Sequence, residues 1–265
     1  MSKKISLKQF LMKSGRFDRV QDCIDAVRKG KITVNNQKIA NPSYFFNPKK
    51  ELVKLNNEKI KIIAKLYLIM NKPAGYLSQK SNEEKTIYDL LKNLNLSNEA
   101  IQSLHAVGRL DKDTEGLLIL ANDGKISNII MNPENKIIKK YHAVLENPVD
   151  KNKIKILEKG IEISIGNEKY KTKPCKIKVV GDKEIYISIL EGKKRQIRKM
   201  FDATGNKIVY LRRVSIGGLQ LGNMKLGEIK QVTREEIVEK LAFDFISNVY
   251  KRSLILDFYS GVGLL

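Results

Sequence analysis

The sequence is poor in the residues that build metal centres and disulfide scaffolds. Its 265 residues include two cysteines, two histidines and no tryptophan. Cys23 and Cys175 lie far apart and neither belongs to a C-x-x-C pair, so we expect neither a disulfide scaffold nor a cysteine-based zinc site. His105 and His142 are the only histidines, so a histidine-rich metal site is not expected either. This pattern predicts reduced thiols in a cytoplasmic protein without a bound metal.

Long apolar runs and acidic residues are also scarce. No stretch approaches the roughly 20 apolar residues of a membrane-spanning helix, and residues 1–4 lack the apolar core of a signal peptide. The chain has 50 Lys and Arg against 29 Asp and Glu, a formal net charge of +21. This excess indicates a polyanionic partner. Because the basic residues are spread along the chain, nucleic acid is favoured over a membrane surface.

The first sixty residues predict a small unit of two helices and a hairpin. Apolar residues recur at helical spacing over residues 7–11 and 20–27, and Gly30 ends the second helix. A strand over residues 32–34 and the turn Asn35-Asn36 follow. A solvated charged face is the simpler interpretation of the basic side chains here, but such a rim can also bind RNA phosphates. The candidate RNA-binding residues of this unit are Lys13, Arg16, Arg19, Arg28, Lys29 and Lys31.

This segment resembles the RNA-binding domain named after ribosomal protein S4. In that family a basic helix precedes a G-[KR]-V-x-V-N-G turn, and residues 30–36 read G-K-I-T-V-N-N. Ile32 replaces the usual valine and Asn36 the usual glycine, and asparagine also tolerates the left-handed region. The resemblance covers residues 5–55 and implies an S4-like RNA-binding domain over residues 1–60.

The remaining chain is long enough for a second domain. Strand-like and helical patterns do not alternate strictly, which favours an α+β fold with a mixed or antiparallel sheet. Strands are expected over residues 66–70, 117–121, 139–145, 161–165, 175–180 and 185–190. Helices are expected over residues 86–91, 124–131, 193–201 and 234–241.

Residues 108–120 place several charged side chains in a short turn before an apolar strand. Asp111 follows Arg109, and the predicted helix carrying Arg195 and Arg198 could meet it. A carboxylate paired with arginine stays ionised and can act as a nucleophile or stabilise charge. Asp111, Asp113 and Glu115 could also work as paired carboxylates, as in a glycosidase. An aspartate alone in a loop is more often a turn residue.

Several segments together resemble the RsuA-type ribosomal RNA pseudouridine synthases. Residues 108–118 resemble their G-R-L-D-x-x-T-x-G-L-L signature, and residues 190–200 resemble E-G-[KR]-x-R-Q-[IV]-R-[RK]-M. Similar agreement is found for N-K-P-x-G at residues 71–75, for K-Y at Lys140-Tyr141, and for a later strand motif at residues 211–222. The order of these motifs after the S4-like segment matches that family over residues 5–240, and it implies a catalytic domain over residues 65–245.

The resemblance implies site-specific conversion of uridine to pseudouridine in ribosomal RNA. Asp111 would be the catalytic aspartate, Tyr141 would stack on the flipped base and take part in proton transfer, and Arg198 would pair with Asp111. Arg109, Lys193, Arg195 and Gln196 would contact the RNA. Neither a cofactor nor a metal is implied. We expect a monomer that acts on ribosomal RNA or a pre-ribosomal particle, without a membrane partner.

Two further interpretations remain open. The chain could be a non-catalytic ribosomal RNA-binding or assembly factor that has kept the fold. Residues 254–265 resemble the first strand and glycine turn of an S-adenosylmethionine-dependent methyltransferase, which suggests an RNA methyltransferase. That fold needs far more chain than follows, so residues 246–265 are expected to be a truncated or fused remnant.

Overall fold

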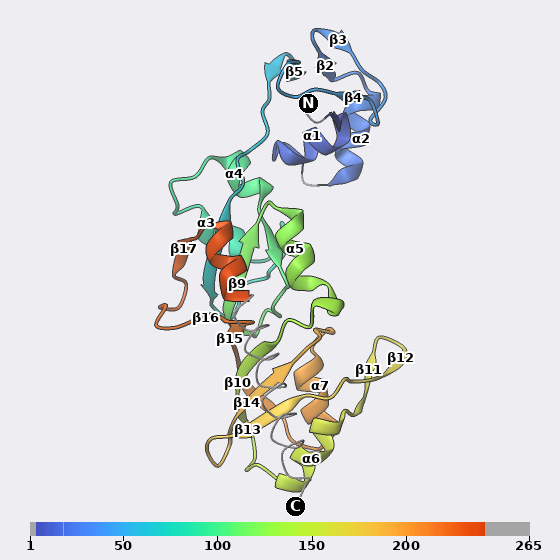
Figure 1. The fold of residues 1–265 in the computed structure, drawn as a ribbon. Coiled ribbons are helices and arrows are strands. Elements are labelled where there is room, and N and C mark those ends of the chain that lie inside the picture. The colour runs from blue at the N-terminus through green and yellow to red at the C-terminus, as the bar shows by residue number, and fades with distance from the viewer. Residues whose placement is uncertain (1–3, 18, 242–265) are drawn as a thin grey trace, which may run out of the picture. The chain divides into compact units, whose positions relative to one another are not determined.

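The computed structural model in Figure 1 describes residues 4–17 and 19–241. The tail of residues 246–265, with its methyltransferase-like motif, lies outside the described residues. The chain forms two compact units. Within the described residues, the first comprises residues 4–17, 19–66, 88–105 and 120–123, and the second comprises residues 67–87, 106–119 and 124–241. In the described ranges, no helix is both long and apolar enough to cross a membrane.

The first unit contains the predicted pair of helices and hairpin. Helix α1 spans Leu7–Lys13 and α2 spans Val20–Arg28. They enclose an apolar core with the strands, in which Leu7, Cys23 and Ile32 are fully buried. Asn35 and Asn36 have φ of 49° and 67°, which confirms the predicted turn. The strands are β1 Ile5–Ser6, β2 Ile32–Val34, β3 Gln37–Lys38, β4 Phe45–Phe46, β5 Val53–Leu55 and β6 Glu58–Lys59.

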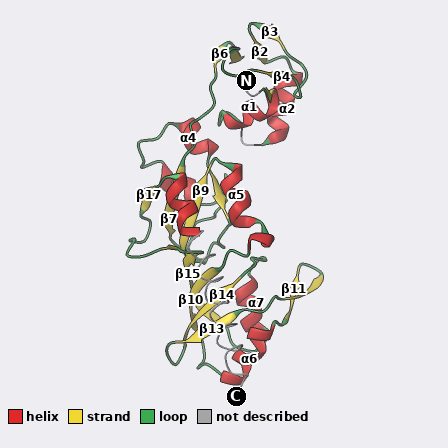
Figure 2. Ribbon diagram, in the orientation of Figure 1, coloured by secondary structure: helices red, strands yellow, loops and turns green. Residues whose placement is uncertain are grey.

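Most of the second unit is organised around one mixed sheet (Figure 2), which confirms the predicted mixed α+β architecture. Its main path runs β13-β14-β10-β15-β9-β7-β17, with β16 beside β15 and β8 beside β9. The β9–β15 pair is parallel, whereas β10 is antiparallel to both of its neighbours. The strands are β7 Tyr67–Lys72, β8 His105–Val107, β9 Glu115–Ala121, β10 Lys139–Leu145, β13 Lys176–Val179, β14 Glu184–Ile189, β15 Ile208–Ile216, β16 Leu219–Gln220 and β17 Ile229–Gln231.

A separate hairpin and several helices complete the fold. The hairpin pairs β11 with β12, and it lies between α6 and β13 in the chain. Helix α6 packs against β13, and α7 packs against both β11 and β15. The remaining elements are α3 Ile87–Leu91, α4 Asn98–Ser103, α5 Gly124–Met131, a 3₁₀ turn Pro133–Asn135, α6 Lys151–Lys159, β11 Glu162–Ile165, β12 Glu168–Lys171 and α7 Gln196–Asp202. Residues 234–241 are also helical.

The register of the sheet aligns one row of side chains across five strands. Ile177 lies opposite Ile187, Ile187 opposite Tyr141, Tyr141 opposite Arg213, and Arg213 opposite Gly116. Side chains opposite one another in neighbouring strands share a face of the sheet. This row therefore connects the apolar core to the start of β9, directly after the charged turn singled out in the sequence.

Candidate active site

The turn of residues 108–116 joins β8 to β9 and carries the half-buried Asp111. Gly108 and Gly116 bracket it with φ of 78° and 105°, a region that favours glycine. The backbone N–H of Thr114 donates to the Asp111 carbonyl at 3.1 Å, which closes the turn. The glycines therefore let the chain bend sharply on both sides of Asp111.

Lys72, at the end of β7, holds this turn from inside the fold. Its side chain is fully buried. Its ammonium group donates to the carbonyls of Pro73 at 3.0 Å, Asp111 at 3.2 Å and Thr114 at 2.9 Å, and lies 3.4 Å from that of Lys112. Burial lowers the pKa of Lys72 to about 8, against the pull of nearby carboxylates. The ammonium group thus joins the backbone of the turn, at Asp111 and Thr114, to the residue after β7.

The loop after β7 adds direct bonds to the same turn. Ser78 is buried, and its hydroxyl accepts from the backbone N–H of Leu110 at 3.1 Å and donates to the Leu110 carbonyl at 2.7 Å. The N–H of Gly75 donates to the Lys112 carbonyl at 2.8 Å. The residues on both sides of Asp111 are therefore tied to the loop that follows Lys72.

Arg213 on β15 supports the turn at its two glycines. It is 1% exposed, and its guanidinium donates to the carbonyls of Leu117 at 2.7 Å and Gly108 at 3.0 Å. A Cβ at Gly116 would lie 2.2 Å from the Arg213 carbonyl oxygen, so the strands approach too closely for any other residue. The close β9–β15 pairing therefore requires glycine at position 116.

Two arginines contact the turn, Arg195 directly before α7 and Arg198 within it, and both pair with Asp113. Arg195 donates from both terminal nitrogens to the two Asp113 carboxylate oxygens at 3.0 Å each. The Nε of Arg198 lies 3.3 Å from the same carboxylate, and its Nη2 donates to the Asp113 carbonyl at 3.0 Å. Burial alone would raise the pKa of Asp113, but the Arg195 hydrogen bonds and the two positive charges outweigh it and hold the pKa below its usual value.

The structure corrects the expected partner of Arg198. The family resemblance implied a pair with Asp111, whereas the ion pair of Arg198 is with Asp113, two residues further along the turn. The Arg198 side chain is only 10% exposed and lies on the buried side of α7. Arg109, expected beside Asp111, donates to the Gln79 side chain at 2.8 Å. The charge of Asp111 still acts on Arg198, after stronger effects from burial and Asp113.

Tyr141 is buried on β10, on the row that leads to Gly116 and the turn. It lies opposite Arg213, next to a register shift between Lys140 and Tyr141. Such bulges redirect side chains and are common beside active sites. The sheet therefore places Tyr141 one strand away from the arginine that supports the Asp111 turn.

The predicted RNA-contacting residues differ in exposure. The six basic residues of the first unit, together with Arg109, Lys193 and Arg195, are exposed. Gln196 is the exception, because it is 3% exposed. Its amide nitrogen donates to Glu191 at 2.6 Å and its oxygen accepts from the Lys193 N–H at 3.0 Å. Its assignment as an RNA contact is therefore corrected, because the side chain is occupied inside the fold.

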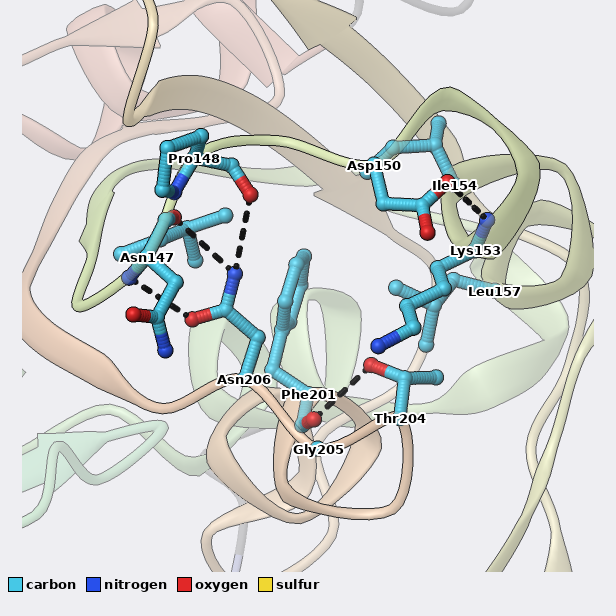
Figure 3. Close-up of a pocket in the computed structure, with 11 residues that line it drawn as sticks. Asn147, Pro148, Asp150, Lys153, Ile154, Leu157, Phe201, Thr204, Gly205 and Asn206 are labelled. Atoms are coloured by element: carbon cyan, nitrogen blue, oxygen red, sulfur yellow. Dashed lines mark hydrogen bonds between the residues drawn. The ribbon is translucent and has the colours of Figure 1, made fainter.

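A small cavity of about 70 Å³ is lined by α6, by the connection that leads into it and by the end of α7 with the loop that follows (Figure 3), and none of the site residues above lines it. Asn206 is one of its polar lining residues. Its amide donates to the Asn147 carbonyl at 3.0 Å, and its oxygen accepts from the Asn147 N–H at 3.1 Å. This contact joins the loop after α7 to the connection between β10 and α6. Within residues 4–17 and 19–241, no three His, Cys, Asp or Glu side chains gather as metal ligands would.

The segment that carries the Asp111 turn, Tyr141 and the two arginines matches a family of known proteins. The family model described as RNA pseudouridylate synthase matches residues 66–203, about half of the chain, including the turn, Tyr141, Arg195 and Arg198. The chain belongs to the RNA pseudouridylate synthase family. It is 34% identical to an uncharacterized RNA pseudouridine synthase of Bacillus subtilis, covering 80% of this chain and 88% of that protein.

Two further relatives agree. The ribosomal small subunit pseudouridine synthase A of Escherichia coli is 32% identical, with 80% of this chain and 89% of that protein covered. A crystal structure titled pseudouridylate synthase superposes with a TM-score of 0.63 at 30% identity, covering 89% of this chain and 99% of that one. As a member of this synthase family, the chain is an isomerase that acts on RNA.

Three residues that hydrogen-bond to the Asp111 turn were not predicted from the sequence. Lys72, Ser78 and Arg213 bond the turn to β7, its following loop and β15. Lys72 and Arg213 stood inside motifs that resemble the family's, but their charge alone indicates surface residues, since lysine and arginine are rarely buried without partners. Backbone carbonyls are the partners here, and no sequence pattern specifies them.

Proposed function

We propose that this synthase isomerises uridine to pseudouridine at a specific position in ribosomal RNA, with Asp111 as the catalytic carboxylate. The observation that carries the proposal is the Asp111 turn itself. Lys72, Arg213 and the two arginines on Asp113 fix its backbone from three sides, while Asp111 stays half-buried. Such fixed placement is what a reacting group requires.

The reaction breaks the bond between N1 of uracil and C1′ of ribose, turns the base, and joins C5 to C1′. The proton on C5 leaves and N1 gains one, so no redox cofactor is required. The target base must leave its stack, which costs a few kcal/mol. Asp111 then either attacks the target nucleotide or stabilises positive charge as the glycosidic bond breaks, and both roles need its ionised form. Tyr141 is proposed to stack on the flipped base and to exchange a proton.

The choice of ribosomal RNA is supported by charge and by the named relatives. The chain carries a net charge of +21, and the Escherichia coli relative is named for the small ribosomal subunit. We propose that the first unit binds RNA as an S4-like domain through its exposed basic residues. The synthase would then act as a monomer on ribosomal RNA or a pre-ribosomal particle in the cytoplasm.

The test is release of tritium from ribosomal RNA labelled at uracil C5, because that hydrogen leaves only when the C5–C1′ bond forms. Asp111→Asn should lower the single-turnover rate by at least about 10³-fold, as removal of a central catalytic group does, with RNA affinity nearly unchanged. Asp182→Asn is the matched control, because Asp182 is exposed and lies between β13 and β14, away from the turn. Release of tritium by Asp111→Asn at the wild-type rate would disprove the assignment of Asp111 as the catalytic carboxylate.

The sequence also left open a non-catalytic RNA-binding factor, and membership of the synthase family argues against it. That alternative predicts that wild-type protein binds ribosomal RNA and releases no tritium. The same assay therefore separates the two functions.

A further inference from the structure

Glu191 is a buried carboxylate outside the Asp111 turn. It follows β14 and is 8% exposed. Three donors from two segments satisfy it: the Tyr170 hydroxyl at 2.5 Å, the Lys173 backbone N–H at 2.9 Å and the Gln196 side-chain amide at 2.6 Å. A buried carboxylate is retained at little cost only when it is bonded in this way. Glu191 therefore joins the β11–β12 hairpin to the start of α7.

The Gln196 side of this network fixes how α7 begins. Gln196 accepts from the Lys193 N–H through its side-chain oxygen at 3.0 Å, and its own N–H donates to the Lys193 carbonyl at 3.1 Å. Residues 191–196 are thus closed into a loop. Arg195 lies in this loop with φ of 53°, a left-handed conformation that residues other than glycine rarely adopt. Neighbouring bonds must hold such a residue in place.

The conformation of Arg195 has a direct consequence for the active site. Arg195 makes its two 3.0 Å bonds to Asp113 from this position. One turn later, Arg198 contacts both the carboxylate and the carbonyl of Asp113. An unbroken series of bonds therefore runs from Glu191 through the loop and α7 to Asp113, two residues from Asp111.

The hairpin end of the network is also fixed. The hydrogen bond to Glu191, followed by burial, raises the pKa of Tyr170 to about 12, so its hydroxyl remains a donor. The Lys193 ammonium lies 4.8 Å from the centre of the Tyr170 ring. Tyr170 therefore contacts both Glu191 and the loop that Glu191 organises.

We propose that Glu191 is a positioning residue for pseudouridine formation. It fixes loop 191–196 so that Arg195 and Arg198 hold Asp113 and keep the Asp111 turn in its reactive geometry. The β11–β12 hairpin supports it through Tyr170. The inference rests on the proposed role of Asp111 and extends it to a residue that touches neither the turn nor the RNA base.

The test compares Glu191→Gln, Tyr170→Phe and the double variant with wild type. Glu191→Gln removes the negative charge and one acceptor oxygen, so either the Tyr170 hydroxyl must turn to accept from the new amide or two N–H donors lose their acceptor. The single-turnover rate at saturating RNA should fall roughly 10- to 100-fold, as a small misplacement of a reacting group does. RNA dissociation constants should stay within about twofold. Tyr170→Phe should show a smaller loss. The double variant should lose less than the product of the single losses, because both changes act on one network.

Glu162→Gln is the matched control. Glu162 lies on the same hairpin, is exposed, and pairs with Lys169 at 3.0 Å, so its rate should equal that of wild type. A folded Glu191→Gln with wild-type rate, or with weaker RNA binding alone, would overturn the inference. If Glu191→Gln does not fold, a wild-type rate for Tyr170→Phe would overturn it equally. Wild-type protein that releases no tritium would instead refute the proposed function.

Discussion

Lys72 is a buried lysine whose ammonium group donates to backbone carbonyls. Its pKa of about 8 means that it is charged below pH 8 and neutral above it. The neutral amine has one N–H fewer and turns a lone pair toward the carbonyls of the Asp111 turn. The charged form is therefore the one that holds the turn.

We accordingly predict that the single-turnover rate of pseudouridine formation falls as the pH rises through about 8. Lys139 also has a pKa lowered by burial to about 8, so it is the natural competitor. Rates measured between pH 6.5 and 9.5 for wild type and Lys139→Gln separate the two. The fall should persist in Lys139→Gln, and a flat profile in that variant would assign it to Lys139.

Individual site residues could be predicted from the sequence only where they stand in a recognisable motif. Asp111, Tyr141 and Arg198 could be named from the sequence, but the partner of Arg198 could not. The turn brings the carboxylate of Asp113 toward α7, and spacing along the chain does not reveal which of two nearby carboxylates faces a helix. From the sequence, Asp113 and Glu115 were only possible partners of Asp111 in a pair of catalytic carboxylates. In the structure, Asp113 pairs with Arg195 and Arg198. The carboxylate of Glu115 accepts a hydrogen bond from the Tyr210 hydroxyl at 2.9 Å.

The spacing of apolar residues correctly predicted the helices and strands that have one clear apolar face. Strand β10 was predicted with the bounds that it has, Lys139–Leu145. Helix α6, with sequence K-N-K-I-K-I-L-E-K, was missed. Only Ile154 and Leu157 of this helix are buried, while Ile156 is exposed. Its alternating lysines and isoleucines obscure the helical period.

The β9–β15 pairing yields a prediction at the element scale. Gly116→Ala should lower the free energy of unfolding by about 3 kcal/mol, because the new Cβ meets backbone atoms of Arg213 and the residue must keep a positive φ. Urea denaturation would measure this. Gly192→Ala, where an added Cβ meets no atom within 4 Å, should change it by less than about 0.5 kcal/mol. Equal stabilities for the two variants would contradict the close approach of the strands.

For the whole molecule, the composition indicated a polyanionic partner, but it did not indicate which segments of the chain form each compact unit. Residues 88–105 and 120–123 belong to the same compact unit as the first 66 residues. The sequence placed a soft boundary near residue 60, because composition and periodicity describe neighbours in the chain and not contacts between distant segments. The S4-like character of the first unit stays a prediction from its motif.

That prediction has a salt-dependent test. Arg28, Lys29 and Lys31 are exposed at the end of α2 and in the turn after it. Replacing all three with alanine should weaken ribosomal RNA binding and reduce the slope of log K against log salt by roughly 2 to 3. The control removes the same charge from α6, by alanine at Lys151, Lys155 and Lys159. Equal slopes for the two triple variants would show that the first unit does not bind phosphates through these residues.

The central claim is that this synthase makes pseudouridine in ribosomal RNA through Asp111. The most direct measurement is chemical mapping of pseudouridine in ribosomal RNA from cells that lack the protein and carry either the wild-type or the Asp111→Asn gene. We predict that one specific position is unmodified without the protein, is restored by wild type, and stays unmodified with Asp111→Asn present at equal abundance. Restoration by Asp111→Asn, or an unchanged pseudouridine map in cells without the protein, would contradict it.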